Sequence, residues 1–255
     1  MSLDEQNLDE QNLAPPKGLA ILADAVSEDF GLLAALHDRE PTAEALTALR
    51  TTPASDWFGV RLDQSIYDAL DGALASLPDP IDQRALDSLA ADYADIYLVS
   101  TYEAAPVESY WRDDENLVCQ DSMFDVRSWQ TLYGMQAENW RRRSDDHLVL
   151  QLLFLSHLAE FQTEIALRDT ARFLDRHLLL WIGDFAARIE QRAREPWFKA
   201  LVAATAAHAE ATRDLLETAL DEPRWHPLEI EKPEAPDLCQ LKDALKFIPG
   251  TGPSW

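Results

Sequence analysis

Apolar residues recur every three or four positions along much of the chain, which is the period of an amphipathic helix. The clearest case is the segment 18–37, whose apolar side chains fall at Leu19, Leu22, Val26, Phe30, Leu33 and Leu36. The same spacing predicts helices over 41–49, 62–76, 82–99, 122–137, 164–193 (one helix or two) and 197–219. Val, Ile and Thr do not gather into alternating segments of strand length. The pattern therefore predicts an all-α protein.

Two segments depart from this pattern. The segment 146–161 is apolar almost all the way round, which is typical of a helix at the centre of a bundle. Ser144, Asp145 and Asp146 stand at its start, where their side-chain oxygens are suited to cap the first N–H groups of the helix. The stretch 100–121 lacks a clear period, and we expect a long loop there, a common place for functional residues.

The two ends of the chain differ in composition from the helical part. Residues 1–17 are acidic and polar and contain the repeat LDEQN twice, which predicts a disordered tail. Residues 221–255 contain six prolines in a polar setting and are expected to wrap around the body or extend from it. We therefore expect a single helical-bundle domain over 18–220, between an acidic tail and a proline-rich extension.

The net charge is −24, from 46 acidic and 22 basic residues. Nucleic-acid binding requires a basic surface, so the charge argues against such a partner. An acidic field attracts basic peptides, although the same charge also serves solubility alone. No stretch of 18 residues lacks charge, and the acidic N-terminus differs from a secretory signal, so we expect a cytoplasmic protein without stable membrane insertion. Cys119 and Cys239 are not expected to form a disulfide in that compartment.

Sequence motifs of common catalytic and metal sites are missing. None of the six histidines has Glu three positions before it, as ferritin-like di-iron bundles require. Cys-x-x-Cys, glycine-rich phosphate loops and Gly-x-Ser-x-Gly are also missing. We therefore expect no catalytic residue, no metal and no cofactor, and a protein that is not an enzyme.

Asp146 and His147 are the polar residues most suited to a binding site. Together they can present a hydrogen-bond acceptor and a switchable donor to a ligand. Helix capping and a core histidine account for the same two residues. Similarly, His177 and Trp181, four positions apart, fit packing as well as a site. The aromatic residues fit either an ordinary core or a groove for an apolar peptide, namely Tyr93, Tyr97, Tyr110 and Trp111.

Several of these residues also lie in an ordered set of motifs. The run Ser144-Asp145-Asp146-His147-Leu148 resembles the Glu-Pro-x-Asp-His signature of the TorD/DmsD/NarJ family of molybdoenzyme maturation chaperones. The run Phe173-Leu174-x-x-His177-Leu178-x-x-Trp181 resembles the F-L-x-x-H-L-x-x-W helix of that family. Two further segments, Tyr93-x-x-Ile96-Tyr97 and Pro106-Val107-Glu108-Ser109-Tyr110-Trp111, are similar to family patterns in the same order, within roughly residues 18–210.

The chain departs from the signature just before Asp146. The signature has Glu and Pro where this chain has Arg143 and Ser144. The run Arg141-Arg142-Arg143 also places positive charge beside the carboxylate that would bind arginine. This cluster weakens a simple electrostatic picture of the site.

The resemblance implies an all-helical chaperone that assists assembly of a DMSO-reductase-family molybdoenzyme. Such a chaperone binds the twin-arginine signal peptide or an N-terminal segment of its client and delays export until the cofactor is inserted. Carried over by position, the peptide-binding residues would be Asp146, His147, Tyr93, Tyr97, Pro106, Tyr110 and Trp111, with His177 and Trp181 in a structural motif. We expect a monomer or a helix-exchanged dimer. The alternatives are a small-molecule- or nucleotide-binding helical protein using Asp146, His147 and His157, and a structural adaptor that binds no leader peptide.

Overall fold

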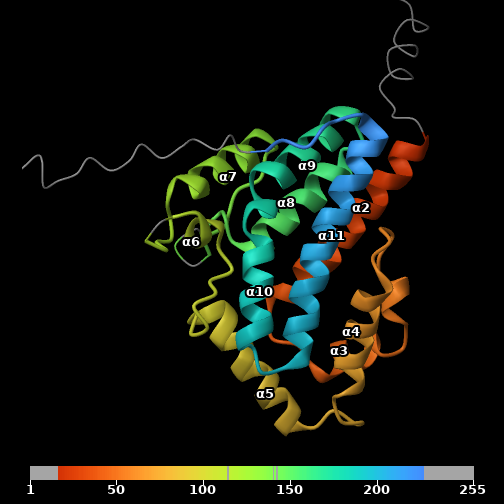
Figure 1. The fold of residues 1–255 in the computed structure, drawn as a ribbon, viewed down its shortest axis with the longest axis vertical. Coiled ribbons are helices and arrows are strands. Elements are labelled where there is room, and N and C mark those ends of the chain that lie inside the picture. The colour runs from red at the N-terminus through yellow and green to blue at the C-terminus, as the bar shows by residue number, and fades with distance from the viewer. Residues whose placement is uncertain (1–16, 114, 140, 142, 227–255) are drawn as a thin grey trace, which may run out of the picture. The chain divides into compact units, whose positions relative to one another are not determined.

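The structure of the protein, a computed structural model, describes residues 17–113, 115–139, 141 and 143–226. In this part of the chain it contains helices and no strand (Figure 1), so the all-α prediction is confirmed. The α-helices are α2 (Lys17–Asp38), α3 (Ala43–Leu49), α4 (Gln64–Ala75), α5 (Gln83–Tyr93), α6 (Glu108–Arg112), α7 (Asp121–Leu132), α8 (Leu148–Glu160), α9 (Glu164–Arg176), α10 (Ile182–Arg192) and α11 (Pro196–Leu220). Three shorter turns are η1 (Ala54–Asp56), η2 (Ala94–Leu98) and η3 (Leu178–Leu180).

The core forms around two long helix contacts. Helix α8 packs along α2, and α11 packs against α4, α9 and α10. The all-round apolar sequence of α8 is explained by this position, because most of its side chains are buried on several sides. The expected apolar stripe of α2 is also in the core, with Val26, Phe30 and Leu33 fully buried.

Polar side chains set the starts of several helices. Thr42 accepts a hydrogen bond from Ala45 N at 3.2 Å and caps α3, and Asp82 accepts one from Ala85 N at 2.8 Å and caps α5. Pro196 occupies the first position of α11, where a missing N–H costs nothing. Asp221 ends α11 in the left-handed region with φ 50°.

Some element boundaries differ from those predicted from the sequence. Helix α8 begins at Leu148, and its N-cap is His147, so the predicted caps at 144–146 are wrong. The predicted loop 100–121 contains the short helix α6. The predicted helix 82–99 is α-helical only to Tyr93 and continues as the π-type turn η2. The segment 164–193 forms two helices, α9 and α10, separated by η3.

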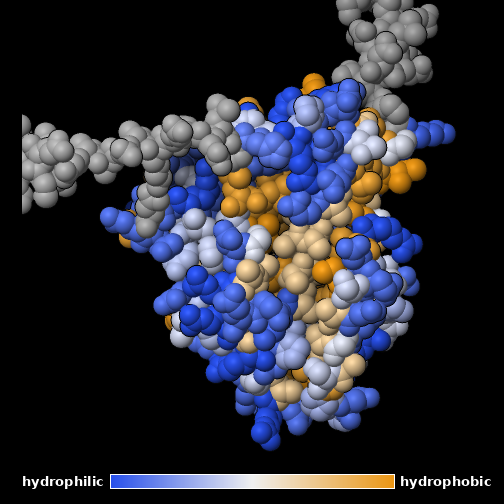
Figure 2. All heavy atoms as spheres, viewed as in Figure 1, coloured by the Kyte–Doolittle hydropathy of each residue, from blue (hydrophilic) through white to orange (hydrophobic). Residues whose placement is uncertain are grey.

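An apolar band lies on the surface along α11 and its neighbours. Figure 2 shows this band between rims of hydrophilic side chains on the same face as in Figure 1. On α11 the alanines Ala203, Ala206, Ala207 and Ala211 are partly exposed.

The last described residues are held on α9. Glu222 forms ion pairs with Arg168 and Arg172, and Trp225 N donates to the Asp175 carboxylate at 2.8 Å. The compact unit formed by the helices ends at Trp225. Residues 1–16 of the predicted tail and 227–255 of the predicted extension lie outside the described residues, so both remain predictions. None of the described helices has both the length and the hydrophobicity needed to cross a bilayer.

Candidate functional site

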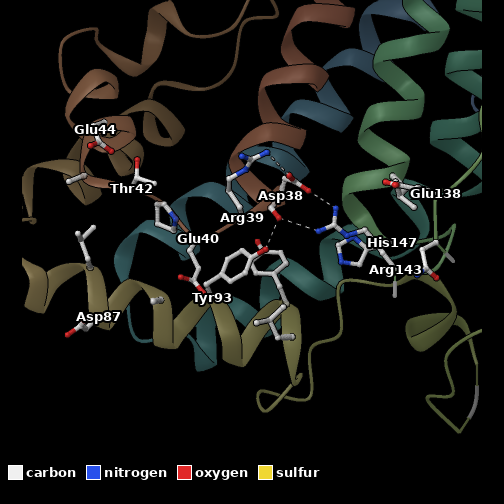
Figure 3. Close-up of a pocket in the computed structure, with 18 of the residues that line it drawn as sticks. Asp38, Arg39, Glu40, Thr42, Glu44, Asp87, Tyr93, Glu138, Arg143 and His147 are labelled. Atoms are coloured by element: carbon white, nitrogen blue, oxygen red, sulfur yellow. Dashed lines mark hydrogen bonds and ion pairs between the residues drawn. The ribbon is translucent and has the colours of Figure 1, made fainter. Parts of the chain in front are cut away.

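A cavity of about 1130 Å³ opens beside the C-terminal end of α2 (Figure 3). Its walls come from the end of α2, the start of α3, the exposed side of α5 and η2, and they are completed by Ala137, Glu138, Asn139, Arg143, His147 and Leu150. Sequence-distant segments therefore meet here, and several predicted site residues are among them.

The charged lining of the cavity is mostly acidic. It has five carboxylates against two guanidinium groups, the acidic residues being Asp38, Glu40, Glu44, Asp87 and Glu138 and the basic ones Arg39 and Arg143. Within the described part of the chain, Asp38 is the only one of the five in an ion pair. Unpaired carboxylates around a concave surface concentrate cations there.

Two stacked tyrosines form the apolar wall. The rings of Tyr93 and Tyr97 lie 4.7 Å apart at 28°, and both pack on Phe198 from α11. Tyr93 donates its hydroxyl proton to Asp38 O at 2.8 Å, and the Tyr97 hydroxyl lies 2.5 Å from His37 Nδ1. Leu86, which lies on α5, and Leu98, which is 64% exposed on η2, extend the apolar area. Both tyrosines are therefore held in place by the core while lining the cavity.

His147 presents one edge of its ring to the cavity. Its Nδ1 accepts a hydrogen bond from Val149 N at 3.1 Å, which caps α8. Burial lowers the pKa of His147 to about 3, and the positive charge of Arg143 adds to this effect. The ring is therefore neutral at physiological pH, with its proton on Nε2, which can donate to a ligand.

Asp146 lies beneath the cavity rather than in its lining. The residue is fully buried, and its Oδ2 accepts a hydrogen bond from Ser109 N at 2.8 Å. Burial raises the pKa of Asp146 above its usual value, although the hydrogen bond from Ser109 opposes that rise. The carboxylate therefore joins two segments of the protein and does not face a ligand in this structure.

The segment that begins at Pro106 is pinned to the start of α8. Val107 and His147 form an isolated antiparallel bridge, in which Leu148 N donates to Pro106 O at 2.8 Å and Glu108 N to Asp146 O at 3.1 Å. The fold thus brings together the segments 106–111 and 144–148, the two motifs that resemble family patterns. It does so through the backbone, and Pro106 itself is buried.

Tyr110 and Trp111 do not line the cavity. The Trp111 ring packs against Phe185 of α10 with centroids 6.2 Å apart, and its Nε1 donates to Ala105 O at 2.8 Å. Tyr110 is half-buried with its ring 5.4 Å from that of Trp111. The structure therefore separates these two aromatic residues from Tyr93 and Tyr97.

His177 and Trp181 belong to a buried network around Glu108. Gln151 donates to Glu108 Oε2 at 2.7 Å, and Trp181 donates to Gln151 Oε1 at 3.4 Å. His177 Nδ1 lies near the same carboxylate. His177 and Trp181 therefore help to hold Glu108 of α6 and Gln151 of α8 in one buried hydrogen-bond network.

Asp38 and Arg143 lie in the cavity, and the sequence reading did not select either of them for the site. One signal was available for Asp38, because a carboxylate in the last turn of a helix opposes the helix dipole unless a cation compensates it. Arg143 is that cation, 105 positions away. The described residues contain no cluster of His, Cys, Asp or Glu suited to a metal ion.

Comparisons with known proteins agree on one family. Residues 63–187 match the family model described as nitrate reductase delta subunit. The chain is 28% identical over 185 residues to the chaperone protein TorD of Vibrio cholerae serotype O1 (strain O395), covering 68% of this chain and 83% of that protein. It is 25% identical over 201 residues to TorD of Shewanella pealeana and 24% identical over 199 residues to TorD of Shewanella oneidensis, in each case covering 75% of this chain and 90% of the relative. These relatives are named as chaperones rather than enzymes, and the chain belongs to the TorD/DmsD/NarJ family of chaperones.

Proposed function

We propose that this protein is a cytoplasmic maturation chaperone for a DMSO-reductase-family molybdoenzyme. It binds the twin-arginine signal peptide or N-terminal segment of its client in the cavity beside α2, and it delays export until the cofactor is inserted. The observation that carries the proposal is the combination, in one cavity, of an apolar tyrosine wall and four carboxylates without ion pairs among the described residues.

The two parts of the cavity suit the two parts of such a peptide. Arginine side chains gain charge-assisted hydrogen bonds from carboxylates such as Glu40 and Glu44. The apolar residues of a leader peptide can cover Tyr93, Tyr97 and Leu98, which line the same cavity. The volume of about 1130 Å³ is at the upper end of the range of small-molecule pockets, roughly 300–1,000 Å³, and suits a peptide segment.

His147 and Asp146 take different roles in this proposal. The Nε2–H of His147 faces the cavity and can donate to a peptide carbonyl. Asp146 is a positioning residue, since it fixes Ser109 against the start of α8 and so supports the His147 ring. Tyr110, Trp111 and Pro106 stabilise the segment behind the cavity.

The test uses the full chain and a synthetic peptide with two consecutive arginines followed by an apolar stretch. Binding is measured by titration calorimetry for the wild type and for the double variant Glu40→Gln, Glu44→Gln. We expect the affinity to fall about threefold to tenfold, because two partly exposed charge pairs are lost. A peptide with glutamine in place of both arginines should bind comparably weakly to both proteins.

The control removes the same charge elsewhere. Glu28 and Glu190 are exposed, lie outside the cavity and form no ion pair with another described residue. Glu28→Gln, Glu190→Gln should change the affinity by less than about twofold, since general attraction by the acidic surface is screened at physiological salt. Absence of binding by the wild type, or equal effects of the two double variants, would overturn the proposal.

A further inference from the structure

The C-terminal end of α2 is a ready-made acceptor site for a guanidinium group. Asp38 offers two acceptors on the same side, its carboxylate and its main-chain carbonyl. The carbonyl is one of those that the end of a helix leaves without a helical partner, so it carries the negative end of the helix dipole. Tyr93 holds this carbonyl in place with a hydrogen bond of 2.8 Å.

Arg143 fills this acceptor site in the structure. Its Nη1 lies 2.5 Å from Asp38 Oδ1, and its Nη2 donates to Asp38 O at 3.2 Å. Figure 3 shows the guanidinium reaching from the far wall of the cavity to Asp38. The side chain is 33% exposed, so a ligand in the cavity can reach the pair. Burial alone would raise the pKa of Asp38, but Arg143 and then Arg39 hold it below its usual value.

We infer that Arg143 is an internal substitute for a ligand arginine. It occupies the Asp38 site in the unliganded protein, and an arginine of the bound peptide takes its place in the complex. This inference rests on the proposed function. The geometry favours arginine over lysine, because a planar fork can bond both Asp38 acceptors at once, whereas an ammonium group is a single point charge.

The exchange has a consequence for selectivity. Replacing one arginine by another on the same acceptors changes the free energy little, so a lone arginine gains almost nothing from the site. A ligand displaces Arg143 only if it makes further contacts, such as a second arginine near the remaining carboxylates and an apolar segment on the tyrosines. Glu138 lines the same cavity and offers the displaced Arg143 another partner. Arg143 therefore competes with cationic ligands for Asp38 and lowers the affinity of those that make no further contacts.

The closing experiment compares two arginines that contact the same carboxylate. Arg39 also pairs with Asp38, at 3.1 Å, but its side chain is 79% exposed and bonds only one Asp38 oxygen. Arg143→Gln and Arg39→Gln thus remove equal charge from one cavity. We expect Arg143→Gln to bind the two-arginine peptide about tenfold more tightly than the wild type, and Arg39→Gln about twofold more tightly. Asp38→Asn should bind it more weakly than the wild type.

A second probe separates the inference from the proposed function. N-acetylarginine methylamide should bind Arg143→Gln measurably and the wild type at least about tenfold more weakly, whether or not a leader peptide binds. Arg143→Lys keeps the charge but not the planar fork, and its affinity should lie between those of the wild type and Arg143→Gln. This variant replaces Arg143→Gln in the test if the glutamine variant does not fold. An affinity of Arg143→Gln that is equal to or below that of Arg39→Gln, for either probe, overturns the inference. If the wild-type protein does not bind the leader peptide but the variants behave as expected with N-acetylarginine methylamide, the proposed function is overturned and the inference stands.

Discussion

His177 Nδ1 lies 3.2 Å from both carboxylate oxygens of Glu108, and both side chains are buried. The same carboxylate accepts hydrogen bonds from Arg112 on α6 and from Gln151 on α8. A single buried side chain therefore links α6, α8 and the end of α9.

Replacing Glu108 by glutamine should destabilise the protein strongly. The amide turns one acceptor into a donor that faces other donors, and it leaves nearby polar groups without partners in the core. We expect the free energy of unfolding to fall by about 3 kcal/mol, measured by urea denaturation. Glu103→Gln is the control, because that carboxylate is 68% exposed and should cost less than about 0.5 kcal/mol. A loss below about 1 kcal/mol for Glu108→Gln would show that the network contributes little.

Asp146→Asn should leave both stability and peptide affinity nearly unchanged. Asparagine keeps an oxygen that accepts from Ser109 N, and it avoids placing a charge in a buried site. Asp146→Ala leaves that N–H without a partner and should cost about 1–3 kcal/mol of unfolding free energy. Parallel calorimetry and urea denaturation test both variants. If Asp146→Asn folds normally but loses affinity for the peptide, Asp146 contacts the ligand directly.

Stability should fall as the pH drops below about 6.5. Burial lowers the pKa of His37 and of His147 to about 3. Between the two values the unfolded chain binds protons that the folded protein does not, so the free energy of unfolding decreases as the pH falls and levels off near the folded pKa. Each histidine contributes about 1.4 kcal/mol per pH unit in this window.

The variant His37→Gln tests this pH dependence. Its unfolding free energy should depend less steeply on pH between about 6 and 4 than that of the wild type. The exposed His226 serves as a control, and His226→Gln should keep the wild-type slope. Identical slopes for all three proteins would contradict a neutral, buried His37.

Gly59→Ala should destabilise the protein because the backbone approaches α2 closely at this point. A Cβ on Gly59 would lie 2.7 Å from the Cβ of Ala25. The loop cannot move away easily, since Asp29 accepts hydrogen bonds from Gly59 N at 2.8 Å and Val60 N at 2.9 Å. We expect a loss of about 1–3 kcal/mol in unfolding free energy.

Gly72→Ala provides the matched control for this substitution. Gly72 lies within α4, and a Cβ there meets nothing within 4 Å. Alanine should stabilise the helix by up to about 1 kcal/mol, so the two variants should move the thermal midpoint in opposite directions. Equal effects would mean that the approach of Gly59 to α2 does not restrict the side chain.

The helices were predictable from the sequence because their apolar stripes are what the core buries. Leu174, Leu178, Trp181, Phe185 and Ile189 recur at helical spacing within the predicted segment 164–193, and all are almost completely buried. The ends of the helices were harder to predict, since an end depends on which side chain reaches a particular N–H group. At α8 the ring of His147 takes that role, because Asp146 is drawn to Ser109 on a segment distant in the sequence.

Residues of the candidate site were predictable only where they share a local motif. Tyr93, Tyr97 and His147 were selected from aromatic spacing and a short signature, and the fold places all three in the cavity. The pair of Asp38 and Arg143 arises from tertiary packing, so no local spacing indicates it. Tyr110 and Trp111 show the converse, since an aromatic pattern alone does not say toward which side of the molecule the rings point.

The π-type turn η2 is equivalent to one extra residue in the helix that begins at Gln83. Such a turn absorbs the extra residue locally, so removing one residue there would restore the α-helical hydrogen bonds without altering the helix before it. Within the five residues of this turn, Tyr97 lies next to His37, and both Tyr97 and Leu98 line the cavity. Because a wider turn holds more residues, successive side chains diverge less than the about 100° of an α-helix, and both can line the same cavity.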